Sequence, residues 1–242
     1  MLLSHFGEAM LRLWESSVNE LDPTPMEAGV DPELVRAANV LMALVLLLLT
    51  MPFLLLAMLA VRLTSRGPVI YRQVRVGMDR RNRDDIPRGR RGEDLGGRPF
   101  TIFKLRTMHV GAEQEGQPVW ATPDDPRVTP VGRFLRDTRI DELPQLFNVL
   151  RGDMNLVGPR PERPQIVLQL KDQVDNYQLR HRVRPGITGL AQVSQPYDAS
   201  VDDVRRKVEY DLQYLARRTV ANDLRILAMT VPTVLRLEKR TA

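Results

Sequence analysis

Two adjacent carboxylates, Asp141 and Glu142, follow three arginines and form the densest group of residues that could do chemistry. The arginines are Arg133, Arg136 and Arg139. A carboxylate can attack phosphorus to form an acyl phosphate, while a neighbouring acid holds Mg²⁺ and arginines disperse charge on the phosphate oxygens. The alternative is structural: Asp141 would cap a helix over 141–150, and Glu142 would favour its first turn. The residues alone leave both interpretations open.

Two further basic motifs fit a phosphate ligand. Lys104 and Arg106 lie two residues apart in a predicted strand, so both side chains are expected on one face of it. Arg160 stands between Pro159 and Pro161, which restrict the backbone and reduce the entropy lost when the guanidinium binds an anion. Each motif by itself is weak evidence for such a site.

The composition limits the other kinds of site and partner. The 242 residues include no cysteine and three histidines without metal-ligand spacing, so neither thiol chemistry nor a histidine-built metal centre is expected. Of 35 basic and 30 acidic residues, two basic and seven acidic lie in 1–36, which leaves 33 basic and 23 acidic residues in the remainder. A basic body implies an anionic partner: nucleic acid, lipid headgroups or a phosphorylated substrate. An aromatic content of 5%, with no stacking platform, argues against nucleic acid.

Residues 37–61 carry no charge and lie between Arg36 and Arg62. A helix over this run could cross a hydrocarbon layer of about 30 Å, so it is predicted to enter a membrane. Pro52 divides the run, and a sharp break there would give two short arms that return to one side, with Thr50 satisfying a freed carbonyl. One kinked spanning helix is the alternative. Both interpretations place the body after Arg62 in the cytoplasm.

The remaining sequence predicts a mainly helical α+β protein in three parts. Residues 1–36 form an acidic amphipathic extension and linker, 37–62 the membrane helix, and 63–242 the catalytic domain. Short strands are predicted over 69–76 and 99–108, separated by an arginine-rich loop at 79–98. Helices are predicted over 141–150, 163–180, 201–217 and 222–239, with a loop or turn at 184–193. The last helix has the basic amphipathic pattern of helices that lie in the membrane interface.

Several of these segments occur in the order found in one family. The sequence resembles the bacterial sugar transferases, or monotopic phosphoglycosyl transferases, which are polyprenyl-phosphate hexose-1-phosphate transferases. The resemblance is carried by the apolar segment with Pro52 and by the motifs at 65–77, 103–108, 141–154, 156–161 and 184–189.

The resemblance implies a function and a set of site residues. Asp141 would attack the sugar-bearing phosphate of a UDP-sugar, release UMP and form a covalent intermediate, which undecaprenyl phosphate would then attack. Glu142 would bind Mg²⁺ as the cofactor. Phosphate binding is expected at Lys104, Arg106, Arg136, Arg160 and Arg184.

Its implied location is the bacterial inner membrane. The family pattern implies a re-entrant helix with both ends on the cytoplasmic face, in contact with membrane lipids. It leaves the oligomeric state open, a homodimer included. Two other functions fit parts of the sequence: an inactive membrane-anchored scaffold for glycan-assembly enzymes, and a tethered nucleic-acid-binding module. Intact Asp141, Glu142 and Arg160 argue against the first, and the low aromatic content against the second.

Overall fold

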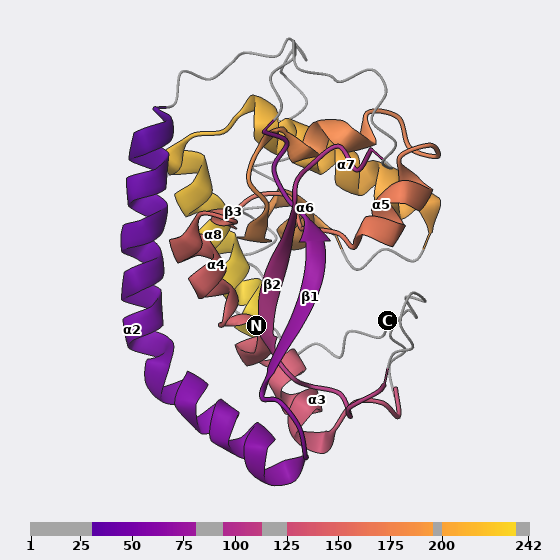
Figure 1. Ribbon diagram of the computed structural model, residues 1–242. Coiled ribbons are helices and arrows are strands. Elements are labelled where there is room, and N and C mark those ends of the chain that lie inside the picture. The colour runs from indigo at the N-terminus through magenta and orange to yellow at the C-terminus, as the bar shows by residue number, and fades with distance from the viewer. Residues whose placement is uncertain (1–30, 81–93, 113–124, 196–199, 236–242) are drawn as a thin grey trace.

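The computed structural model describes residues 31–80, 94–112, 125–195 and 200–235 (Figure 1). The predicted amphipathic helix in residues 1–30 and most of the arginine-rich loop at 79–98 lie outside these ranges. The fold is mainly helical with small sheets, as predicted. Its elements are α2 (Pro32–Thr64), β1 (Ile70–Val76), β2 (Pro99–Leu105), α3 (Pro130–Asp137), η1 (Ile140–Glu142), α4 (Gln145–Arg151), β3 (Asn155–Val157), α5 (Pro164–Leu170), η2 (Tyr177–Arg182), β4 (Gly186–Thr188), α6 (Leu190–Ser194), α7 (Val201–Ala216) and α8 (Val220–Leu235).

The helix α2 is longer than the apolar run and continuous through Pro52. It begins where the Asp31 carboxylate accepts a hydrogen bond from the Glu33 N–H at 2.8 Å, with Pro32 in the first turn. The expected sharp break is instead a bend within one helix, visible partway along α2 in Figure 1. Thr50 donates to the Leu46 carbonyl at 2.6 Å, and not to the Leu48 carbonyl that Pro52 leaves without its helical donor.

One stripe of α2 packs on the body of the protein and the rest of its surface is exposed and apolar. The buried stripe is Val35, Asn39, Ala43, Leu47, Leu54, Ala57 and Val61. On the opposite faces Leu48 is 77% exposed and Leu56 is 65% exposed. In the described part of the chain, α2 is the helix long and apolar enough to cross a membrane. An exposed leucine-rich surface of this size is a candidate for contact with lipid.

The two predicted strands are present as β1 and β2, and they pair antiparallel. Its register places Ile70 opposite Leu105 and Val76 opposite Pro99. This pairing carries Lys104 to the position opposite Tyr71, near the end of β2 that leads to α3.

The prediction of a loop at 184–193 was wrong, because this segment contains β4 and α6. Strand β4 pairs in parallel with β3, which the sequence did not predict either. The backbone segments at Gly158 and Gly186 approach each other closely. A Cβ on Gly186 would lie 2.1 Å from the Gly158 nitrogen. Only glycine fits this contact, so the glycines that suggested a turn serve strand pairing.

Two predicted helices are divided. The helix expected over 141–150 is the short turn η1 followed by α4, because the positive φ of Arg139 ends the path of α3 and Pro144 begins a new helix. The helix expected over 163–180 is α5 and η2, separated at Asn176, whose φ is 59°. In contrast, α7 follows its prediction within one residue, and α8 begins two residues before the predicted start.

The core lies where α2, α4, β2, β3 and α8 meet. Leu47, Leu105, Val149, Leu156 and Ile226 contribute one buried side chain from each of these elements. Ile140 and Leu143, on either side of the acidic pair, pack against the same core. The turn that carries Asp141 and Glu142 is therefore fixed against the body and in contact with α2.

Candidate active site

The acidic pair lies in η1, a single 3₁₀ turn between α3 and α4. Arg139 enters this turn in the left-handed conformation, and its carbonyl accepts a hydrogen bond from the Glu142 N–H at 3.1 Å. Asp141 is 7% exposed and Glu142 is 8% exposed. Burial of two adjacent carboxylates is costly unless cations or a ligand compensate for it.

Three cations converge on one oxygen of Glu142. The Oε1 atom lies 2.9 Å from Nζ of Lys104, 3.0 Å from Nη2 of Arg160 and 3.7 Å from Nη1 of Arg139. Burial alone raises the pKa of Glu142, but Arg160, Lys104 and Arg139 together hold that pKa well below its usual value. Glu142 is therefore ionised throughout the physiological pH range.

Asp141 has a different environment from its neighbour. Its Oδ1 atom is buried and accepts no hydrogen bond from the described residues. Burial raises the pKa of Asp141 to about 6, the Glu142 charge adds to the rise, and Lys104, Arg139 and Arg136 oppose it. At pH 7 most of this carboxylate is ionised, and a carboxylate with a raised pKa is more basic than an ordinary aspartate.

The elements that carry the site are joined by a buried asparagine. Asn148, on α4, accepts a hydrogen bond from the Phe103 N–H at 3.1 Å and donates to the Thr101 carbonyl at 2.7 Å. Its amide therefore attaches α4 to β2, the strand that holds Lys104. This contact fixes Lys104 relative to the turn that precedes α4.

A buried ion pair supports the loop that carries Arg160. Nη2 of Arg180 contacts Asp211 at 2.7 Å and also donates to the Arg160 carbonyl at 3.0 Å. Glu162, two residues after Arg160, pairs with Lys207 at 2.6 Å. These contacts hold the backbone on both sides of Pro161, so the Arg160 side chain reaches Glu142 from a fixed base.

The predicted site residues are only partly brought together. Lys104 and Arg160 contact Glu142, and Arg136 donates to the Thr107 hydroxyl at 2.9 Å while its charge acts on Asp141. Arg106 is bound elsewhere: its guanidinium donates to the Ser65 and Arg66 carbonyls at 2.8 and 2.7 Å.

The remaining predicted residue, Arg184, contacts the opposite end of α4 from the acidic pair. Its Nε donates to the Gly152 carbonyl at 3.1 Å. Direct contact of Arg106 and Arg184 with substrate stays a prediction.

Sequence reasoning placed Arg139 among the arginines that would disperse phosphate charge but did not predict its contact with Glu142, and it assigned no role to Arg180 or Asp211. Arg139 was visible as the third arginine before the acidic pair, and its spacing of three from Glu142 is the available signal. The Arg180–Asp211 pair had no local signal, because its partners are distant in sequence.

A buried carboxylate oxygen remains available for a divalent cation. Among the described residues, Oδ1 of Asp141 has no hydrogen-bond partner, while Lys104, Arg160 and Arg139 contact Glu142 at Oε1. The described ranges contain no cluster of three or more histidine, cysteine or acidic side chains that could hold a metal ion. A pair of carboxylates fits Mg²⁺, which commonly keeps water and substrate phosphates as its other ligands.

Comparison with known proteins identifies the family of this chain. Residues 31–237 match the bacterial sugar transferases, and the chain belongs to this family. It is 40% identical over 227 residues to the UDP-glucose:undecaprenyl-phosphate glucose-1-phosphate transferase of Klebsiella pneumoniae, covering 93% of this chain and 43% of that protein.

Two other relatives show the range of the family. A UDP-N-acetylgalactosamine-undecaprenyl-phosphate N-acetylgalactosaminephosphotransferase of Aeromonas hydrophila is 39% identical, covering 92% of this chain and 48% of that protein. A UDP-glucose:undecaprenyl-phosphate glucose-1-phosphate transferase of Caulobacter vibrioides is 42% identical, covering 83% of this chain and 69% of that protein. The chain thus spans less than half the length of the Klebsiella and Aeromonas proteins.

Proposed function

We propose that this protein transfers a sugar-1-phosphate from a UDP-sugar to polyprenyl phosphate, with undecaprenyl phosphate as the acceptor. The observation that carries the proposal is the pair of unlike carboxylates: three cations contact Glu142, whereas Asp141 keeps a buried oxygen that accepts no hydrogen bond from the part of the chain that the structure describes. We take undecaprenyl phosphate and a UDP-sugar as the substrates because both occur in the names of the relatives described above.

In the first step, Asp141 attacks the phosphorus that bears the sugar. The bond from this phosphorus to the oxygen bridging the two phosphates breaks, and UMP leaves with that oxygen. The charges of Arg136 and Arg139 act to lower the pKa of Asp141, so both guanidinium groups lie near it. In the reaction they stabilise the negative charge that develops on the phosphate oxygens. The product is an aspartyl phosphosugar on the protein.

In the second step, an oxygen of polyprenyl phosphate attacks the same phosphorus. The acyl phosphate bond breaks, Asp141 regains its carboxylate, and the sugar leaves linked to the lipid through a diphosphate. The turn that carries Asp141 contacts α2, so a nucleophile beside the apolar helix is well placed for an acceptor dissolved in the membrane.

Mg²⁺ is the proposed cofactor, with Glu142 as its ligand. When bound, the ion would neutralise charge on the diphosphate of the donor. Lys104 and Arg160 contact Oε1 of Glu142 and hold its side chain in place for this role.

The contacts at the two ends of α2 support a re-entrant arrangement with both ends on the cytoplasmic side. Near its start, Arg36 donates to the Val149 and Leu150 carbonyls at 2.5 and 2.7 Å. At its end, Ser65 and Arg66 accept hydrogen bonds from Arg106. Both ends of α2 are thus bound to one polar body. A helix that spanned the membrane would instead place its two ends at opposite faces of the bilayer.

UMP release from a series of UDP-sugars, with undecaprenyl phosphate in detergent micelles, tests the function. Wild-type protein and the control Asp137→Asn, which neutralises an exposed carboxylate on α3, should release UMP and retain labelled sugar phosphate before acceptor is added. Asp141→Asn should do neither. Adduct formation by Asp141→Asn would show that another group is the nucleophile, and a silent wild type would favour the scaffold.

The absence of cysteine makes the topology directly testable. Single cysteines at Asp31 and Ser65 should both react with an impermeant thiol reagent from the cytoplasmic side of oriented vesicles. Labelling from opposite sides would establish a spanning helix.

A further inference from the structure

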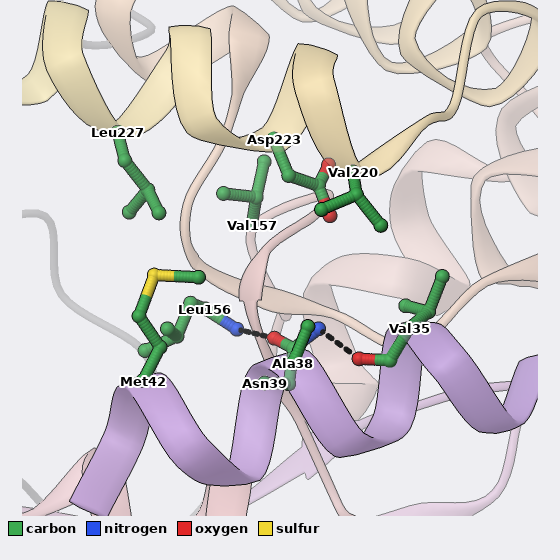
Figure 2. A pocket seen from close by; sticks show the side chains of 9 residues that line it. All are labelled: Val35, Ala38, Asn39, Met42, Leu156, Val157, Val220, Asp223 and Leu227. Atoms are coloured by element: carbon green, nitrogen blue, oxygen red, sulfur yellow. Dashed lines mark hydrogen bonds between the residues drawn. The ribbon is translucent and has the colours of Figure 1, made fainter. Parts of the chain in front are cut away.

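Asn39 is a buried polar side chain within the apolar run of α2, and it binds the body of the protein. It is 5% exposed, and its Nδ2 atom donates to the Val35 carbonyl at 2.9 Å within the helix. Its Oδ1 atom accepts a hydrogen bond from the Leu156 N–H at 2.7 Å (Figure 2). The first bond can form in an isolated helix, whereas the second requires that α2 lies against β3. A polar side chain with such a contact in a membrane helix is a candidate for a functional role.

The second bond supplies a partner that the sheet does not provide. In the part of the chain that the structure describes, β3 and β4 form a sheet of two strands. Leu156 is 3% exposed, so its N–H has no access to water, and a buried amide without a partner is costly. Figure 2 shows the bond among apolar side chains of α2 and α8, including Met42 and Leu227. Since these side chains limit competition by water, the contact with Asn39 is well protected.

The segment 156–162, which begins at this contact, is held through its backbone at every residue. Its seven partners are, in chain order, the Asn39 side chain, the Tyr214 hydroxyl, the Thr188 carbonyl, the Gly186 N–H, the Arg180 guanidinium, the Arg75 guanidinium and the Val76 N–H. Asn39 is the partner that belongs to α2. Pro159 and Pro161 further restrict the backbone, so a displacement at the start of the segment is passed on to Arg160 with little slack.

Arg160 is the residue of this segment that reaches the acidic pair. It follows Leu156 by four residues, and its Nη2 atom lies 3.0 Å from Oε1 of Glu142. A contact of this length tolerates only a small displacement before the hydrogen bond is lost. A misplacement of about 1 Å in a catalytic site can lower the rate about 10²-fold, even when its origin is remote from the chemistry.

The turns of α2 that carry Asn39 also present an apolar surface on their other side. Leu34 and Leu41, five residues before and two residues after Asn39, are 59% and 66% exposed. At about 100° of rotation per residue, both lie on the far side of the helix from Asn39. The part of α2 that offers this surface to lipid is thus the part that holds Leu156.

We propose that Asn39 is a positioning residue, through which the seating of α2 on the body sets the place of residues 156–162 and thereby the reach of Arg160 to Glu142. Removal of its acceptor oxygen releases the first residue of the segment and leaves the side chains of the acidic pair unchanged. This role rests on the proposed function, because the reach of Arg160 matters to activity if the site binds a phosphorylated donor.

The contact itself is tested by hydrogen exchange of the full-length protein in micelles, followed by mass spectrometry of peptides that contain residues 156–162. Asn39→Leu, which has a similar volume but no acceptor, should speed exchange in this segment about tenfold. Thr50→Val is the matched control, because Thr50 is also a polar side chain of the apolar run but donates within α2, to the Leu46 carbonyl. It should leave this exchange unchanged. Asn39→Ala removes the same acceptor with a smaller side chain and replaces Asn39→Leu if that variant does not fold.

The effect on activity is tested by a double-mutant cycle with UMP release as the readout. Asn39→Leu should lower kcat/KM for the UDP-sugar about tenfold in the wild type, but less than about twofold in Arg160→Gln, where the positioned side chain is already gone. Thr50→Val should change kcat/KM by less than about twofold in either background. A general loss of stability would lower activity at least as much in Arg160→Gln as in the wild type, so the cycle separates positioning from a merely structural role.

Either of two results would overturn the proposal. One is equal exchange of residues 156–162 in Asn39→Leu and Thr50→Val, and the other is an equal loss of kcat/KM from Asn39→Leu in both backgrounds. The exchange measurement needs no substrate, so it decides on the contact whether or not the wild type is active. A wild type that releases no UMP, with faster exchange in Asn39→Leu, would count against the proposed function and not against the hold of α2 on this segment.

Discussion

Asp141→Asn should raise the thermal stability of the protein at neutral pH while it removes the proposed nucleophile. Burial and the Glu142 charge raise the pKa of Asp141 from 3.8 to about 6. Since one pH unit between the folded and unfolded pKa corresponds to about 1.4 kcal/mol, keeping this carboxylate ionised costs the folded state about 3 kcal/mol at pH 7. For a chain of this size, that is a Tm difference of about 6–12 °C.

The amide of the asparagine needs a partner of its own, which offsets part of this gain, so a rise of about 3–8 °C is expected. The sign of the pH dependence follows from the same pKa. Between pH 6 and pH 4 the folded wild type binds a proton that the unfolded chain does not, so its stability increases as the pH falls. Asparagine does not titrate, and the advantage of the variant should therefore disappear over this range.

The assay is thermal unfolding in micelles, followed by circular dichroism at pH 7.5, 6 and 4.5, with Asp137→Asn as the control for loss of one exposed carboxylate on α3. A Tm of Asp141→Asn at or below that of the wild type at pH 7.5 would refute the reasoning. So would a gain that is independent of pH. Either result would mean that Asp141 is not strained by burial in the folded protein.

Other predictions follow from the same contacts. The rate of UMP release should fall about fivefold from pH 6 to pH 5 as Asp141 is protonated. Arg160→Gln should lower kcat/KM by about 10²-fold and should also lower the Tm, measured by UMP release and thermal unfolding, because it removes a predicted phosphate-binding cation that also compensates the charge of the buried Glu142. Arg180→Met should cost about 3–5 kcal/mol in denaturant unfolding, since it leaves Asp211 buried and unpaired. Arg106→Ala should lower stability by about 2–4 kcal/mol, seen as a lower Tm, because Arg106 holds the end of α2.

The features that sequence predicted well depend on neighbours in the chain. The helix α7 has a regular apolar spacing and a serine cap at Ser200, and its bounds were predicted within one residue. The acidic pair and the arginines before it are likewise local. Asp141 and Glu142 are bracketed by apolar Ile140 and Leu143, which fix the turn on the core.

The features that sequence missed depend on distant partners. Arg106 reaches Ser65, which lies 41 residues before it, and Arg184 reaches Gly152, 32 residues before it. Neither spacing leaves a periodic pattern, so both arginines were assigned to substrate from their motifs alone. The β3–β4 pair has three residues in each strand, which is too short for an alternating pattern.

The attachment of α2 at both ends has a consequence for the order of synthesis. Arg36 binds carbonyls that lie 113 and 114 residues later in the chain, so its partners emerge from the ribosome long after α2 itself. The bent path of α2 can be secured only once α4 has been translated and has folded against it. A chain interrupted before residue 149 would therefore leave Arg36, near the start of α2, without both of these carbonyl partners.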